Sequence, residues 1–139
     1  MTRPLLEAKQ LVVEIGGSTV VDRIDLRVAS GERVAILGRN GAGKSTLLST
    51  LAGLRPPKAG VLLLDGEDAA LLHAREAALR RAWLGQFQSD PFGSTVLETA
   101  LTGRHPHLGR WNWESTRDAE LARGALKAVG LDGMEARQI

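Results

Sequence analysis

The stretch GRNGAGKS, residues 38–45, decides the fold class of this 139-residue chain, because it satisfies the pattern G-x-x-x-x-G-K-[ST] at every defined position. The short apolar run Val34–Leu37 precedes it and predicts a buried strand. Leucines recur at helical spacing over Ser45–Leu54, which follows it. A strand, a glycine-rich turn and a helix in this order predict an α/β domain with a phosphate-binding loop.

The residue types in this loop have a chemical reason. Glycines let the backbone curl so that successive N–H groups point at phosphate oxygens, and the start of the helix adds its positive dipole end. Lys44 supplies a positive charge for the β- and γ-phosphates, and the Ser45 hydroxyl is placed to ligate Mg²⁺. We therefore predict a site for a nucleoside triphosphate with magnesium. Its predicted residues are Gly38, Arg39, Asn40, Gly41, Ala42, Gly43, Lys44, Ser45 and Thr46, the last donating to the α-phosphate.

The remaining elements place this loop between a β-rich first half and a helical second half. The predicted strands are Leu11–Val13, Val20–Val28, Val61–Leu64 (ending in a turn at Asp65-Gly66) and Trp83–Leu84. Helices are predicted over Ala69–Arg81, from Thr95 to about Leu101, and over Ala119–Val129. Thr95 with Glu98, and Ser115 with Asp118, are helix-start signals, and 103–112 is predicted to be a loop.

Composition removes several classes of protein. The chain is 43% hydrophobic and 24% charged, with no cysteine, which excludes disulfide scaffolds, thiolate catalysis and cysteine-ligated zinc. A net charge of only +2 does not suggest a nucleic-acid-coating protein. No apolar run approaches the ~20 residues that a transmembrane helix needs, and Met1–Glu7 lacks the apolar core that is typical of a secretory signal. We expect a cytoplasmic protein.

Several segments resemble the ATP-binding cassette (ABC) family. They are Gly31-Glu32, the run LGRNGAGKSTLL at 37–48, LAGL at 51–54, GVLLLDG at 60–66 and RAWLGQ at 81–86. TVLE at 95–98 and GRHPH at 103–107 look like the ATPase subunits of importers for iron–siderophore, haem or cobalamin. The resemblance implies a P-loop NTPase fold with an N-terminal antiparallel β subdomain.

The resemblance also implies a domain division, site residues and partners. Residues 1–88 would form part of the ATPase core, and 89–139 part of the helical subdomain that faces the membrane partner. Gln86 matches the Q-loop glutamine that contacts Mg²⁺ or the attacking water, with Gln88 close by. Lys44 and Gln86 would then serve catalysis, and Ser45 and Gln86 the metal. Partners would be permease subunits and a second ATPase copy, at the inner face of the membrane, with no nucleic acid.

The sequence departs from the family pattern in two respects. Ile15 stands where the family usually has an aromatic residue stacked on adenine. The family's signature sequence, its strand ending in aspartate with a catalytic glutamate, and its switch histidine would all lie beyond Ile139. We therefore expect a truncated product or partial sequence that binds ATP without hydrolysing it appreciably. Asp65, which follows four apolar residues, is interpreted as a turn residue and not as the missing acid.

Other interpretations stay open. A long coiled coil or a second cassette would favour a soluble ABC-type ATPase acting on nucleic acid or ribosomes. A small P-loop kinase would require a substrate lid and a complete core. His105 and His107 flank a proline without a third ligand nearby, so we interpret them as exposed loop residues. Trp111 and Trp113 either pack locally or meet a partner.

Overall fold

The computed structural model describes residues 3–86, 93–109 and 111–139. The chain forms two compact units that meet in sequence between Arg81 and Ala82, and each is described by itself. The boundary expected between residues 88 and 89, and Gln88 itself, lie outside the described residues. Among the described residues, no helix is long and apolar enough to cross a bilayer.

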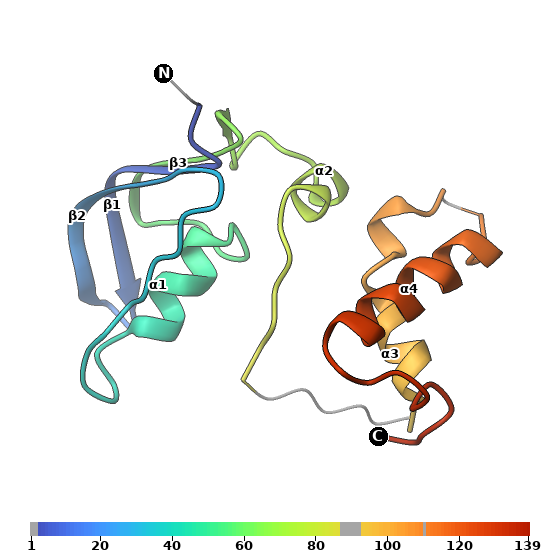
Figure 1. The fold of residues 1–139 in the computed structure, drawn as a ribbon. Coiled ribbons are helices and arrows are strands. Elements are labelled where there is room, and N and C mark those ends of the chain that lie inside the picture. Colours follow the sequence, from blue (N-terminus) through green and yellow to red (C-terminus); the bar gives the residue numbers. More distant parts are fainter. Residues whose placement is uncertain (1–2, 87–92, 110) are drawn as a thin grey trace. The chain divides into compact units, whose positions relative to one another are not determined.

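The first unit is an antiparallel sheet with α1 packed against β1 (Figure 1). The strand order is β2-β1-β3-β4, and all neighbours are antiparallel. The elements are β1 (Leu6–Ile15), β2 (Ser18–Val28), α1 (Lys44–Leu51), β3 (Ala59–Leu64), β4 (Glu67–Asp68) and α2 (Ala74–Leu79). The predicted strands at 11–13, 20–28 and 61–64 and the helix after the glycine-rich loop are thereby confirmed.

The core of this unit lies between the sheet and α1. Its buried members are Ala8, Leu11, Val13, Leu51, Leu62 and Leu64. Leu11 and Val13 alternate along β1 and so share the face that α1 covers, which is the periodicity expected of a half-buried strand. This core fixes α1, and with it the loop that leads into the helix.

Three predicted elements differ in the structure. Val34–Leu37 has no regular secondary structure, because within the described residues it has no neighbouring strand to complete its hydrogen bonds, and Leu37 is 89% exposed. Trp83–Leu84 is not a strand for the same reason. Local apolar content alone therefore overpredicted strands at both places.

The helix predicted over Ala69–Arg81 is shortened to α2. Asp68 holds the residues that follow it in a turn, since its carboxylate accepts from the Ala70 N–H at 2.9 Å and its carbonyl from the Leu71 N–H. The helix begins only after His73, whose N–H donates to the Glu76 carboxylate at 3.0 Å. Alanine and leucine favour helix, but the turn at Asp68 and this cap decide where it starts.

The second unit packs α3 (Val96–Thr102) against α4 (Thr116–Ala128). Both helix-start signals are confirmed, because Thr95 and Ser115 cap their helices through capping boxes. The segment predicted as a loop, 103–112, contains a short 3₁₀ turn at His105–His107. After α4 the chain returns to the start of α3, where the Ile139 N–H donates to the Ser94 carbonyl at 3.0 Å.

Candidate phosphate-binding site

Two glycines of the loop adopt backbone conformations that side chains rarely adopt. Gly41 has φ 81°, and Gly43, the N-cap of α1, has φ 84°. A Cβ atom at Gly43 would lie 2.8 Å from the Cβ of Val20, closer than real contacts allow. The motif therefore needs glycine at position 43 for two separate reasons, its conformation and its contact with β2.

The N-terminus of α1 is open toward the loop. Gly43 provides no side-chain cap, and the first turn of the helix holds no acidic residue. The first N–H groups of a helix have no partner within the helix, and the dipole gives that end partial positive charge. This end of α1 is thus suited to an anion.

The Lys44 side chain hydrogen-bonds back to the backbone of the phosphate loop. Its ammonium group donates to the carbonyl oxygens of Gly38, at 2.8 Å, and Arg39, at 2.7 Å. The two carbonyls are neutral acceptors that keep the Lys44 ammonium at the loop. The N–H groups of the same stretch of backbone would bind phosphate. Because hydrogen bonds to an ionised acceptor are stronger, phosphate oxygens can replace the two carbonyls.

Ser45 lies at the edge of a cavity of about 210 Å³, which is lined by Val34, Ile36, Lys44, Ser45 and Leu48. The side chain of Ser45 is exposed, and within the described residues its hydroxyl has no hydrogen-bond partner. A free hydroxyl oxygen beside a phosphate site fits magnesium, which prefers oxygen ligands and keeps several of its waters. The donor set present therefore fits the predicted Mg²⁺ with phosphate.

The other predicted site residues lie as follows. Arg39, Asn40 and Ala42 are exposed on the loop, while the Thr46 carbonyl, in the first turn of α1, accepts from the Thr50 hydroxyl. Gln86 is exposed and belongs to the second unit, so its part in catalysis and metal binding stays a prediction.

Asp65 is placed away from the loop. It forms the β3–β4 turn with φ 50°, next to the Leu6–Leu64 pair. The contact of Gly43 with Val20 lies at the opposite end of β1, where Val13 pairs with Val21. The structure thus agrees with the interpretation of Asp65 as a turn residue.

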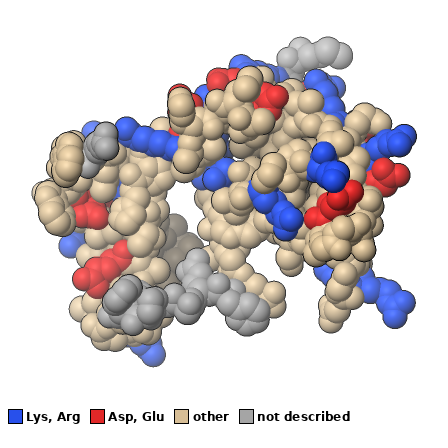
Figure 2. Space-filling view, turned by 180° about the vertical axis from the view of Figure 1, so that it is seen from behind, with Lys and Arg blue, Asp and Glu red and all other residues tan. Residues whose placement is uncertain are grey.

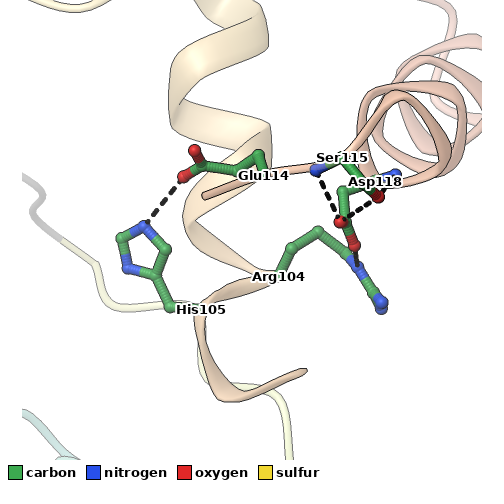
Figure 3. Close-up of polar contacts among 5 residues, drawn as sticks. All are labelled: Arg104, His105, Glu114, Ser115 and Asp118. Carbon is green, nitrogen blue, oxygen red and sulfur yellow. Dashed lines mark hydrogen bonds and ion pairs between the residues drawn. The ribbon is translucent and has the colours of Figure 1, made fainter. Parts of the chain in front are cut away.

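A polar cluster that the sequence did not predict lies in the second unit (Figure 3). The Asp118 carboxylate accepts from the Ser115 hydroxyl at 2.6 Å and from the Arg104 Nε at 2.8 Å. These hydrogen bonds, Ser115 first and Arg104 next, hold the pKa of Asp118 well below its ordinary value. The spacing of Ser115 and Asp118 indicated the cap, but nothing in the sequence pairs Arg104 with it.

One of the two histidines, His105, lies next to this cluster. The His105 Nε2 lies 3.6 Å from the Glu114 carboxylate, so this contact and the Arg104–Asp118 ion pair connect the residues on either side of 106–113 (Figure 3). Within the described residues, no three side chains of metal-ligating type come together. Trp111 and Trp113 are each 88% exposed, so within the described residues neither ring is buried by local packing. On the face in Figure 2, basic and acidic side chains are interspersed.

Comparison with known proteins accords with the loop geometry. Residues 21–139 match the ABC transporter family. The chain belongs to the ABC transporter family. Its relatives include the petrobactin import ATP-binding protein FpuD of Bacillus anthracis, 35% identical over 96% of this chain and 49% of that protein. The hemin import ATP-binding protein HmuV of Rhodopseudomonas palustris is 42% identical, over 96% and 48% of the two chains.

Solved ABC structures share the fold. A nucleotide-free ATP-binding cassette from an ABC transporter matches 97% of this chain and 57% of its own, with a TM-score of 0.75 at 22% identity. A dimeric cassette in a post-hydrolysis state, bound to ADP and phosphate, matches 94% and 60% with a TM-score of 0.73 at 24% identity. This ABC chain spans about half the length of the curated relatives named above.

Proposed function

We propose that this chain binds Mg-ATP through the 38–46 loop as the nucleotide-binding part of an ABC importer ATPase. The observation that carries the proposal is the open N-terminus of α1, with Gly43 at φ 84° and the Lys44 ammonium held at the loop backbone. The ABC membership of residues 21–139 supports ATP as the nucleotide.

Each part of the loop has its own role in binding Mg-ATP. The N–H groups of the loop and of the first turn of α1 hold the phosphates, and Lys44 leaves the Gly38 and Arg39 carbonyls to neutralise the β- and γ-phosphates. Ser45 provides the hydroxyl oxygen for Mg²⁺, which neutralises phosphate charge when bound. Gln86, matched to the Q-loop glutamine, is proposed as a further contact to Mg²⁺ or to the attacking water.

The cargo and partners follow from the relatives. Their names assign import of petrobactin and hemin, and a cobalamin import ATP-binding protein of Halobacterium salinarum is 34% identical over 96% of this chain. We propose the same class of cargo, an iron–siderophore, haem or cobalamin. The proposed partners are permease subunits and a second ATPase copy, with the protein at the inner face of the membrane.

The test is a titration of the 139-residue chain with a fluorescent ATP analogue and Mg²⁺, beside Lys44→Ala. We expect saturable binding that Lys44→Ala weakens at least about a hundredfold, because it removes the charge that meets the β- and γ-phosphates. Lys58→Ala is the matched control: it also removes one lysine, but Lys58 pairs with Glu14 at 3.2 Å on the surface of the same unit. Equal affinities for the two variants would contradict the proposal.

Phosphate release is followed in the same samples. We propose that the chain alone releases no appreciable phosphate, since Asp65, the aspartate after an apolar strand, lies at the end of β1 opposite the loop. Steady release that depends on Lys44 would show that the catalytic acid lies within these 139 residues.

A further inference from the structure

An asparagine followed by a glycine lies in an exposed turn of the phosphate loop. Asn40 and Gly41 are the two central residues of this turn, and both are exposed. The turn is closed by the Ala42 N–H, which donates to the Arg39 carbonyl at 3.2 Å. Gly41 has φ 81°, the positive value that the third residue of a type II turn requires. Figure 1 shows the loop protruding beyond the start of α1.

In an asparagine–glycine pair the glycine nitrogen can attack the side-chain amide of the asparagine, and here both groups are free to react. Within the described residues, neither the Asn40 amide nor the Gly41 N–H has a hydrogen-bond partner. Gly41 has no Cβ, and the space where one would lie is empty to 4 Å, so no side chain shields its nitrogen. The other asparagine of the chain, Asn112, is followed by Trp113, whose bulky side chain hinders the same approach.

Positive charge at the loop favours this reaction. The Gly41 nitrogen loses its proton as it attacks, and negative charge develops on the amide oxygen. The Lys44 ammonium is bound to the Arg39 carbonyl at 2.7 Å, one residue before Asn40. The N-terminus of α1 adds partial positive charge. Positive groups that are already in place stabilise charge that develops in a transition state, so the features that suit the loop to phosphate also suit it to this chemistry.

We propose that Asn40 is a modification site, at which the empty phosphate loop converts asparagine to aspartate or isoaspartate and so loses affinity for Mg-ATP. The Gly41 nitrogen forms a bond to the side-chain carbonyl carbon of Asn40, and the amide nitrogen leaves as ammonia, which gives a cyclic imide. Water then opens the ring: its hydroxyl adds to one of the two ring carbonyl carbons and its remaining hydrogen goes to the Gly41 nitrogen. The product carries a carboxylate, and in isoaspartate the main chain is one carbon longer.

The consequence for nucleotide binding rests on the proposed function. A carboxylate at position 40 stands in the loop that is proposed to hold phosphates, so like charges oppose Mg-ATP. Bound Mg-ATP protects Asn40, because its phosphate oxygens accept from the N–H groups of the loop and hold the Gly41 nitrogen away from the amide. Occupancy by nucleotide therefore determines how long the loop stays able to bind it.

The experiment follows both asparagines by peptide mass spectrometry during incubation of the 139-residue chain in mild base. The signal is the mass gained when NH₂ is replaced by OH. Without nucleotide, we expect Asn40 to react at least about tenfold faster than Asn112, because only its neighbouring nitrogen is unshielded. Mg-ATP at about ten times its Kd should slow the Asn40 reaction about tenfold, since only the unoccupied fraction reacts. In Lys44→Ala the same concentration should give no protection.

Mg-ATP binding is measured on the same samples. The fraction of chains that bind with the original affinity should fall in step with the modified fraction of Asn40. Asn40→Gln, whose longer side chain closes such a ring far more slowly, should keep its own starting affinity throughout. Asn40→Asp should bind Mg-ATP about tenfold more weakly than the unaltered chain, because it places a negative charge beside the phosphates. Asn112→Asp, in the second unit, is the matched control and should bind as the unaltered chain does.

Three results would overturn the inference. They are equal reaction rates at Asn40 and Asn112, no protection by Mg-ATP in a chain that binds it, and an unchanged affinity after Asn40 has reacted. A fresh chain that binds Mg-ATP no more tightly than Lys44→Ala would instead overturn the proposed function, so the two failures are distinguishable.

Discussion

The N-termini of α1 and α4 both have N–H groups without partners inside the helix, and the two ends provide for these groups in opposite ways. At α4, Ser115 caps the helix and Asp118 lies in the first turn, where its carboxylate accepts from the Ser115 N–H at 3.0 Å. At α1, Gly43 caps without a side chain and the first turn holds no acid. The end of α4 is complete within the protein, whereas that of α1 leaves its positive end for a ligand.

The largest expected effect comes from Gly43→Ala, which would break the open end of α1. An alanine there has an unfavourable φ and a Cβ 2.8 Å from that of Val20. We expect Mg-ATP affinity to fall about a hundredfold, because a shifted loop loses about one strong hydrogen bond to the charged phosphates. The free energy of unfolding, measured by urea titration, should fall by about 2 kcal/mol or more.

Gly31→Ala separates conformation from contact. Gly31 has φ 78°, but a Cβ atom there meets nothing within 4 Å. This variant should lower the free energy of unfolding by about 1 kcal/mol and leave Mg-ATP affinity unchanged. If both variants bound Mg-ATP equally, the contact between Gly43 and β2 would not shape the phosphate site.

A smaller effect should follow from giving α1 the acidic first turn of α4. Thr46→Glu places a carboxylate three residues after the N-cap, the position that Asp118 occupies in α4. Thr46→Gln is the matched control, with the same shape and no charge. We expect the Glu variant to bind Mg-ATP about tenfold more weakly than the Gln variant, because like charges repel at the phosphates.

Thr46→Glu and Thr46→Gln should also differ in stability, and here the Glu variant should be the more stable one although it binds Mg-ATP more weakly. A carboxylate in the first turn interacts favourably with the helix dipole, so Thr46→Glu should unfold at slightly higher urea than Thr46→Gln. Equal Mg-ATP affinities of the two variants would mean that the phosphates lie away from the first turn of α1.

Local signals explain which parts of this structure could be predicted from sequence. Ser115 and Asp118 satisfy each other three residues apart, so their pattern was sufficient to place α4. The phosphate loop could be predicted equally well, because every residue that defines its motif lies within eight consecutive positions.

The errors and omissions concern interactions between distant segments. The apolar run Val34–Leu37 needed a neighbouring strand that the described residues do not supply. The fit of Val20 against Gly43 depends on a bulge set by strand pairing, and Arg104 meets Asp118 only because the chain folds back there. No local pattern specifies such contacts.

The smallest expected effect is the pH dependence of stability at the N-terminus of α4, which Ser115 and Asp118 cap. Because the folded pKa of Asp118 is below its ordinary value of 3.8, the unfolded chain binds the proton more readily. The stabilisation from this carboxylate is therefore complete above that value and is lost as the pH falls through the folded pKa. We expect amide hydrogen exchange in α4, corrected for intrinsic rates, to show protection that declines in acid.

Asp118→Asn should expose the origin of that decline. The variant cannot ionise, so its α4 should be less protected than that of the unaltered chain at neutral pH, with a difference that narrows as the pH falls below 3.8. Asp132→Asn removes an exposed carboxylate after α4 and should leave protection of the helix unchanged. A constant difference between Asp118→Asn and the unaltered chain at all pH values would mean that Asp118 supports α4 by its shape and not by its charge. The contrast with the first turn of α1, which holds no acidic residue, would then lose its electrostatic basis.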